Sequence, residues 1–407
     1  MPETAENIKK VAVIMDGQQT QFLELDQDRP LAAIIRDLCD VWALTNPDDF
    51  SLQFNEINRH GFITERNRVE IMKGNVLQLT FSPAKTAEQI LYRLQNGSQE
   101  EKGLALKQLT ELAIDSTFAQ EFINKKGLQL IINMIEGGTC TGEGLAYTLK
   151  AFVELMDHSI VSWDVLDPAF IKTVSESINM RKGDACILQS ALEIMENIVL
   201  HSANKYSLVE QAVTPVNLIQ HLQSSNPDIQ KNAIALINAL FLKADPEKRK
   251  RITENLQSKS IRNVILNNVI RGSSSIGTEM AHQLYVLQSL MFNLLEGRRG
   301  TEIDINDQGT VKDILNLRKI AFDSEPDPNP IASRRESHAR DFKKLGFQDN
   351  INPALDFTEV PPGILALDNI VYFAKMHAES FTKVVLENSC RSDDHDLPFA
   401  HASIALD

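Results

Sequence analysis

The chain has 407 residues, of which 43% are hydrophobic and 24% are charged. This composition is typical of soluble globular proteins, and the length allows about two to four domains. Its 41 basic and 55 acidic side chains give a formal net charge of −14 at pH 7. That charge argues against a broad nucleic-acid-binding surface and against a polybasic membrane anchor. No uncharged apolar run approaches the ~18 to 20 residues that a membrane span needs.

The cysteine pattern indicates neither a metal site nor a cofactor. The four cysteines are Cys39, Cys140, Cys186 and Cys390, and they show none of the short spacings of zinc sites. Such usage fits a reduced cytosolic protein. The first residues, MPETAENIKK, carry charges where a secretory signal needs an apolar stretch. We therefore expect a cytoplasmic chain that binds no cofactor and no metal.

Residues 1–82 predict a small β-rich domain. Stretches 8–16 and 21–25 alternate apolar and polar residues around Gly17, which is the pattern of a β-hairpin. A helix is expected from Pro30, followed by strands at 50–54, 61–64 and 75–81 and a helix-like stretch at 65–74. The order β-β-α-β-β-α-β is that of a ubiquitin-like (β-grasp) roll. Such a domain either docks a partner, usually by adding the partner's edge strand to its own sheet, or only caps the region that follows.

Docking modules of this kind commonly present cations to the acidic switch region of a Ras-like GTPase. The candidate GTPase-binding residues are the exposed cations Lys9, Lys10, Arg29 and Arg36. Residues 1–82 hold 8 basic and 13 acidic side chains, so charge complementarity is weak support for this interpretation.

Residues 83–322 predict an armadillo-like or HEAT-like helical solenoid. Five segments are apolar at their second, fifth and eighth positions: 105–112, 148–155, 191–198, 233–240 and 283–290. Apolar residues at i, i+3 and i+6 indicate a helix that buries one broad face. The last members of these columns are 43, 43, 42 and 50 residues apart. A period of ~40 to 47 residues is typical of armadillo or HEAT units. The alternative is an ordinary helical domain with evenly spaced helices.

Further signals fill in the predicted repeats. A second apolar run follows four of the helices, at 127–135, 168–174, 215–222 and 261–270, so each unit is at least a helix pair. Ser82 predicts the N-cap of the first helix, and the glycine-rich stretch 136–144 predicts a short connection. His158 and Trp163 lie close to two acids but without a second histidine at ligand spacing, which favours packing and capping over metal binding. His282 is expected at the edge of a helix interface.

Residues 323–340 are polar and rich in proline, and they predict a mobile linker or surface loop. Within them Arg334-Arg335-Glu336-Ser337 has the form that basophilic kinases prefer, so Ser337 is a possible phosphorylation site. A phosphate would add roughly −1.5 to −2 charge beside two arginines. An unmodified, solvated charge cluster is the alternative. Residues 341–407 return to helical apolar periodicity, and we expect them to form part of a larger domain.

Five longer segments carry a family resemblance: 118–124, 151–164, 237–244, 279–288 and 345–358. With them the chain closely resembles the N-terminal part of the engulfment-and-cell-motility (ELMO) proteins from about residue 8 onward. The resemblance implies a Rho-family-GTPase-binding ubiquitin-like domain over 1–82. It also implies an armadillo-type region over 83–322 that can hold the molecule autoinhibited, and the first part of an ELMO domain over 341–407.

The same resemblance implies a non-enzymatic adaptor. Its partners would be a GTP-bound Rho-family GTPase such as RhoG, the cytoplasmic tail of an engulfment receptor or adhesion protein, and a DOCK-type exchange factor that loads Rac. The implied result is actin remodelling in phagocytosis, migration and cell fusion, with the chain recruited to the plasma membrane. We expect the family's main DOCK contact, a C-terminal PH domain and proline-rich tail, to lie outside this chain.

An enzymatic alternative comes from the same domain family, because some ELMO-domain proteins resemble GTPase-activating proteins for Arf-like GTPases. Their motif has the form GFQ…P…DxR, and this chain has Gly346-Phe347-Gln348, Pro353 and Asp356-Phe357 at the matching positions. Thr358 stands where the arginine would fall. A finger-type arginine contributes ~10³ to 10⁵ in rate by neutralising charge on the transferring phosphate, and a threonine has no charge to offer. Thr358 therefore argues against this activity, unless Arg340 or Arg391 substitutes.

Overall fold

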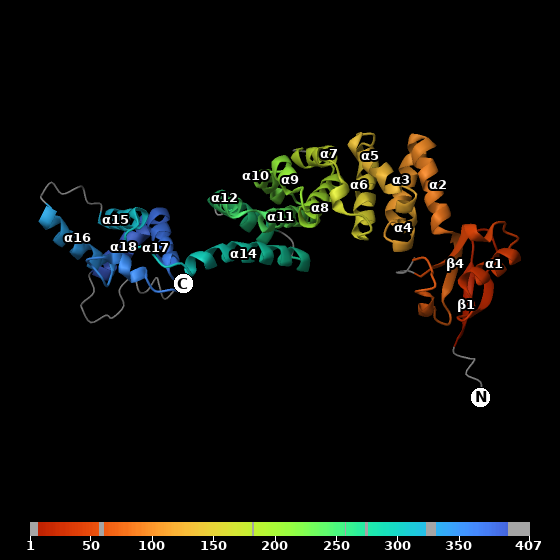
Figure 1. The fold of residues 1–407 in the computed structure, drawn as a ribbon, viewed down its shortest axis with the longest axis horizontal. Coiled ribbons are helices and arrows are strands. Elements are labelled where there is room, and N and C mark those ends of the chain that lie inside the picture. Colours follow the sequence, from red (N-terminus) through yellow and green to blue (C-terminus); the bar gives the residue numbers. More distant parts are fainter. Residues whose placement is uncertain are drawn as a thin grey trace, which may run out of the picture. The chain divides into compact units, whose positions relative to one another are not determined.

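The computed structural model describes residues 7–56, 61–180, 183–256, 258–272, 276–322 and 331–389. The chain divides into two compact units, Met1–Leu284 and Tyr285–Asp407. The first unit holds a small sheet and a series of helices, and the second unit is helical in its described part (Figure 1).

The first unit opens with a four-stranded sheet in the order β2-β1-β4-β3. Its strands are β1 Ile8–Ile14, β2 Gln21–Asp26, β3 Phe50–Phe54 and β4 Val76–Phe81. Strand β1 pairs antiparallel with β2 and parallel with β4. Helix α1, Leu31–Val41, begins directly after Pro30 and buries Ile34 and Leu38 in one core with Val11 and Val13 of β1. The predicted ubiquitin-like roll is confirmed.

Two elements predicted for this domain were wrong. Stretch 61–64 makes only an isolated bridge, between Gln53 and Phe62, and stretch 65–74 forms only a short 3₁₀ turn, η3 at Arg68–Glu70. The Asn67 side chain explains the difference, because its Oδ1 accepts from the Thr64 N–H and its Nδ2 donates to the Phe62 carbonyl. Such bonds satisfy the backbone groups that a ladder or a helix would otherwise use.

The helices that follow the sheet confirm the predicted solenoid. They are α2 Pro83–Asn96, α3 Gln99–Leu112, α4 Ser116–Asn124, α5 Gly127–Glu136, α6 Gly142–Asp157, α7 Pro168–Asn179, α8 Ala185–His201, α9 Tyr206–Ala212, α10 Pro215–Ile219, α11 Pro227–Lys243, α12 Pro246–Leu256 and α13 Lys259–Val264. Figure 1 shows α3, α6, α8 and α11 one after another, and each packs against the next. Helix α14, Thr278–Arg299, carries the fifth predicted segment.

The apolar columns of the repeats form the core. The central members Leu109, Phe152, Met195 and Ile237 are all almost completely buried. Trp163 lies edge-on to Phe152 with ring centroids 5.8 Å apart, so its role is packing. Two histidines join neighbouring repeats through backbone carbonyls: His158 Nε2 is 2.6 Å from the Ala113 oxygen and His221 Nε2 is 2.8 Å from the Ile178 oxygen. His282 is exposed.

Local signals for helix ends also hold. The Ser82 hydroxyl accepts from the Lys85 N–H at the start of α2. Gly138 and Gly142 have φ of 58° and 54°, in the left-handed region that glycine adopts without strain. Gly138 lies in the connection between α5 and α6, and Gly142 begins α6.

The carboxylate of Asp115 links the sheet domain to the first repeats. Its Oδ1 caps α4 by accepting from the N–H groups of Thr117 and Phe118, at 2.8 and 3.0 Å. Its Oδ2 accepts from the N–H of Phe62 at 2.9 Å. Phe62 is buried, so a charge-assisted bond at this position restrains both elements.

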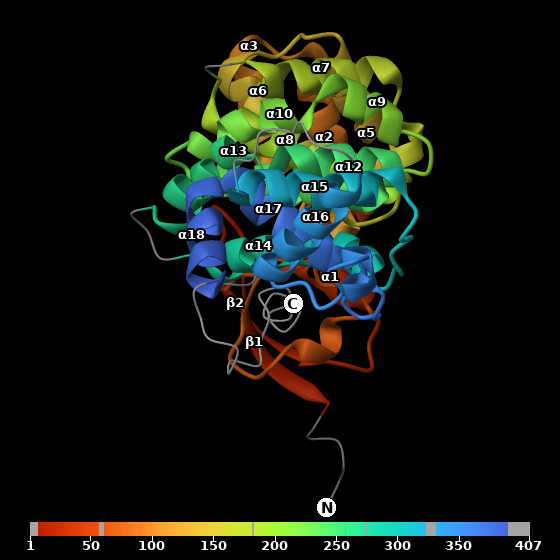
Figure 2. The same ribbon diagram turned by 90° about the vertical axis from the view of Figure 1, so that its left-hand side faces the viewer.

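The second unit contains α15 Gln308–Phe322, α16 Ile331–Leu345, the 3₁₀ turn η7 Pro353–Phe357, α17 Ile364–Met376 and α18 Ala378–Ser389. Figure 2 shows these helices gathered together. Their shared core includes Leu317, Phe342, Phe357, Ile370 and Phe381.

The predicted linker 323–340 needs a correction. Helix α16 begins at Ile331, so the stretch from 331 to 340 is helical, whereas 323–330 lies outside the described residues. The chain contains no proline between Pro330 and Phe342, and this stretch is rich in helix-forming Ala, Arg and Glu. Phe342 and Leu345 at the end of the helix are buried in the core and hold it in place.

Candidate functional site

The edge of the N-terminal sheet is the first candidate docking surface. Among the described strands, β2 pairs with β1 only, so its outer side is free to add a strand from a partner. Lys9 and Lys10 lie on β1 beside it. Because side chains alternate along a strand, the two lysines belong to opposite faces of the sheet. Lys10 Nζ lies 3.0 Å from the Glu24 carboxylate on β2.

The other two predicted cations lie near α1. Arg29 Nη2 is 2.7 Å from the Asp37 carboxylate, and Arg36 is exposed on α1. Lys10 and Arg29 thus already have a carboxylate partner on the surface. Exposed pairs of this kind contribute little to stability, but they reduce the field that an acidic partner would feel.

Sequence reasoning missed Phe22. Its side chain is 87% exposed on β2, on the face opposite the core, where the alternation of the hairpin places polar residues. The signal was available, because Phe22 falls in the outward phase of the strand together with Glu24.

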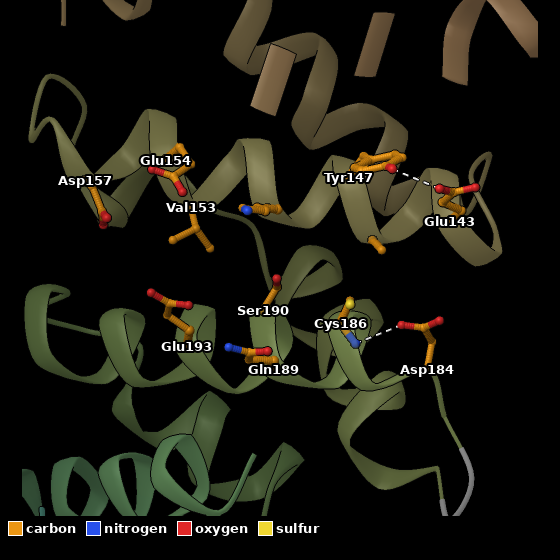
Figure 3. Close-up of a pocket in the computed structure, with 12 residues that line it drawn as sticks. Glu143, Tyr147, Val153, Glu154, Asp157, Asp184, Cys186, Gln189, Ser190 and Glu193 are labelled. Carbon is orange, nitrogen blue, oxygen red and sulfur yellow. Dashed lines mark hydrogen bonds between the residues drawn. The ribbon is translucent and has the colours of Figure 1, made fainter. Parts of the chain in front are cut away.

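The second candidate surface is a groove of about 610 Å³ between α6 and α8. It is lined by Glu143, Ala146, Tyr147, Lys150, Val153, Glu154 and Asp157 from α6, and by Asp184, Cys186, Gln189, Ser190 and Glu193 from α8 and its N-cap. In Figure 3, Ser190 and Glu193 point toward Val153 and Glu154 across the groove. No sequence pattern indicated this groove, because its two walls come from different repeats.

The groove is strongly acidic. Five lining side chains are carboxylates and only Lys150 is cationic. Desolvation, followed by the charge of Asp157, raises the pKa of both Glu154 and Glu193. Desolvation also raises the pKa of Asp157 itself. These carboxylates repel one another in a partly desolvated space, so a cation placed between them would be attracted.

Glu196 lies one turn along α8 from Glu193, next to the acidic groove. Desolvation and then the Glu193 charge raise the pKa of Glu196 to about 7. Lys231 of α11 partly offsets both charges, but its Nζ is already 2.7 Å from the Glu279 carboxylate. In the part of the chain that the structure describes, no group of three His, Cys, Asp or Glu side chains is arranged to hold a metal ion. The five carboxylates that line the groove suit a positively charged peptide.

The predicted Gly-Phe-Gln motif around Asp356 has a structural role here. The Asp356 carboxylate accepts from the N–H groups of Gln348 and Asp349, at 2.6 and 3.0 Å, and so ties the Gly-Phe-Gln loop to η7. The Thr358 hydroxyl donates to the Leu355 carbonyl at 2.8 Å. Thr358 thus ends η7, and its side chain carries no charge.

Several predicted residues remain untested by the structure. Ser337 lies on α16, but its side chain is outside the described residues, as are Cys390 and Arg391. Arg340 is exposed on α16.

Three family models match the chain. Residues 7–82 match the ELMO protein N-terminal Ras-binding domain, residues 117–270 match the ELMO armadillo-like helical domain, and residues 293–407 match the ELMO/CED-12 family. Among the described residues, no helix is both long and apolar enough to cross a membrane.

Curated engulfment and cell motility proteins match the chain over nearly its full length. It is 48% identical to engulfment and cell motility protein 1 of Homo sapiens, over 100% of this chain and 58% of that protein. It is 46% identical to engulfment and cell motility protein 2 of Homo sapiens, over 98% of this chain and 57% of that protein. It is 43% identical to engulfment and cell motility protein 3 of Mus musculus, over 98% of this chain and 56% of that protein. The chain thus spans less than two thirds of these relatives.

Proposed function

The chain belongs to the engulfment-and-cell-motility (ELMO) family, and from this premise we propose that it is a non-enzymatic signalling adaptor. In this proposal residues 1–82 bind an active, RhoG-like Rho-family GTPase, and residues 83–322 bind the cytoplasmic tail of a receptor or adhesion protein. Residues 341–407 contribute to an ELMO domain. The observation that carries the proposal is the match of residues 7–82 to a Ras-binding domain, on a sheet whose edge strand β2 can accept a partner strand.

The adaptor works by recruitment. A GTP-loaded partner at the plasma membrane binds the N-terminal domain, and a DOCK-type exchange factor held by the same protein is concentrated where Rac is loaded. Linking two contacts in this way strengthens the second by ~10² to 10⁴ through effective concentration. The outcome is actin remodelling in engulfment, migration and cell fusion. Release of an autoinhibited form, and phosphorylation of Ser337, would regulate this step.

The test of the GTPase contact is a titration of the full chain against Rho-family and Arf-family GTPases, each in its GDP form and bound to a non-hydrolysable GTP analogue. We expect binding to a Rho-family member in the GTP-analogue form only. Equal binding to both nucleotide forms, or binding to neither, would contradict the proposal. Replacing Lys9 and Lys10 by Glu tests whether the cations contribute.

The acidic groove supports the second contact, because its carboxylates favour a tail rich in Lys and Arg. The expected result is that replacing Glu154 and Glu193 together by Gln weakens binding of such a tail peptide at least about tenfold, because two half-buried charge contacts are lost. Glu176→Gln, at an exposed site on α7, is the matched control. If the two variants bind the peptide equally, the tail contact lies elsewhere on the solenoid.

A further inference from the structure

Phe22 is an exposed aromatic side chain on an edge strand, and it is not one of the cations proposed to bind the GTPase. It is 87% exposed on β2. An edge strand with an outward apolar side chain is a template for pairing with another chain, and folded proteins usually protect such edges with charges or bulges. The exposed Phe22 therefore marks an interaction surface.

The strand register extends this surface across the sheet. Phe22 of β2 lies opposite Ala12 of β1, and Ala12 in turn lies opposite Val76 of β4. In an antiparallel pair, residues directly opposite on one face have Cβ atoms about 4.5 to 5.5 Å apart, so Phe22 adjoins Ala12. Val76 continues the row across the parallel pair of β1 and β4. Val76 is itself 37% exposed. We call Phe22, Ala12 and Val76 the Phe22 row.

The charges beside the Phe22 row are balanced within the domain. The next row on the same face is Lys10 and Glu24, joined by a 3.0 Å ion pair. Arg29 is likewise paired with Asp37 at 2.7 Å. With 8 basic and 13 acidic side chains in residues 1–82, the domain has little net attraction to an acidic GTPase switch region. Apolar contact is the interaction that this surface offers.

We infer that the Phe22 row is the apolar anchor of the GTPase contact: an apolar side chain of the GTPase packs on Phe22 and is buried there. This inference rests on the proposed function, and the match of residues 7–82 to a Ras-binding domain selects a GTPase over a second copy of the chain as the partner. Affinity then depends on burial of Phe22 and only weakly on ionic strength.

The experiment measures the Kd of the full chain for the GTP-analogue form of the Rho-family GTPase that binds wild type. Phe22→Thr keeps a residue that favours strands and removes the aromatic ring. We expect its Kd to rise at least about tenfold, as for a hot-spot aromatic. Val69→Thr, at a 74% exposed site outside the sheet, should leave the Kd unchanged. Raising salt from about 50 to about 300 mM should change the wild-type Kd less than about threefold.

The possible results separate the two ideas. If wild type binds the GTPase and Phe22→Thr binds equally well, the Phe22 row is not the anchor, while the proposed function stands. If wild type binds no GTPase, the proposed function fails and this inference fails with it. If light scattering shows that Phe22→Thr turns a dimer into a monomer without altering GTPase affinity, the row serves self-association and the inference is overturned. Circular dichroism verifies that the variants are folded.

Discussion

Glu196 lies on α8 next to a second acid, and burial disfavours its charged form. Its carboxylate is half-buried, and its neighbour Glu193 has the same charge. Lys231 offsets this repulsion only in part, because it also pairs with Glu279. The pKa of Glu196 is therefore raised to about 7, well above the ordinary value of a glutamate.

This shift predicts a pH dependence of stability. Between the ordinary pKa and about 7 the folded state binds more protons than the unfolded state, so the contribution of Glu196 is fully present at low pH and is lost as the pH rises through about 7. Glu196→Gln should stabilise the protein by roughly 1 to 3 kcal/mol at pH 8 and hardly at all at pH 4.5. Thermal unfolding of wild type and variant at both pH values measures this. An equal gain at both pH values would show that burial, and not charge, causes the effect.

Asp115 acts on two elements with one carboxylate, capping α4 and accepting from Phe62. Asp115→Ala should destabilise the protein by about 1 to 3 kcal/mol, because a cap and a charge-assisted bond to a buried N–H are lost together. Amide hydrogen exchange at Phe62 should accelerate. Asp184→Ala is the control, since Asp184 caps α8 in the same way without bonding the sheet domain. An unchanged rate of amide hydrogen exchange at Phe62 in Asp115→Ala would show that Asp115 does not link α4 to the sheet domain.

Among the elements, α11 shows why the repeats stack. It packs against α8 on one side and the 3₁₀ turn η5, Gln220–Gln223, on another, and most of its residues are buried. Its buried amides Asn232 and Asn238 donate to the Gln189 and Gln283 carbonyls, which belong to the flanking repeat helices. Each helix thus completes the core of the next, and a single repeat would leave its apolar face exposed.

Two leucines on α11 test whether the stacked repeat helices share a core. Leu240 is 1% exposed and Leu242 is 49% exposed. Leu240→Ala should lower the free energy of unfolding by ~2 to 5 kcal/mol, because it leaves a cavity in the repeat core. Leu242→Ala should lower it by about 0.5 kcal/mol or less. Urea unfolding followed by circular dichroism compares the two. If the urea unfolding curve of Leu240→Ala matches that of wild type, Leu240 does not lie in the core.

The candidate surfaces are distributed over both units of the chain. The sheet edge and the groove between α6 and α8 belong to the first unit, and the motif around Asp356 belongs to the second. The groove carries carboxylates for recognition, and in the second unit Asp356 is occupied by backbone N–H groups. This distribution fits an adaptor that joins partners.

The chain should not accelerate GTP hydrolysis by an Arf-like GTPase. Thr358 offers no positive charge to the transferring phosphate, and its hydroxyl is already bonded to Leu355. Single-turnover hydrolysis with and without the full chain measures the effect. Thr358→Arg is the comparison, since it places a cation at that position. Acceleration by the wild-type chain would contradict the adaptor proposal directly.

The helices of the repeats and the roll at the N-terminus could be predicted from sequence patterns alone. Leu109, Phe152, Met195 and Ile237 could be assigned to a core because helical periodicity directly reflects which face is buried. Ser82 likewise marked a helix start, because a cap acts over only a few residues. Local patterns failed at Asn67, where side-chain bonds replaced the expected strand and helix.

The candidate sites, in contrast, depend on how separate elements pack and could not be predicted from the sequence. Glu154 and Glu193 lie in different repeats, and they face one groove because α6 and α8 stack. Lys10 meets Glu24 because of the hairpin register, which turned a predicted binding cation into an internal pair. Phe22 gained its neighbours Ala12 and Val76 only when three strands aligned. These three cases have the same cause. Periodicity reflects which residues are buried along one element. Charge pairing and exposed surfaces depend on distances between elements that are far apart in the chain.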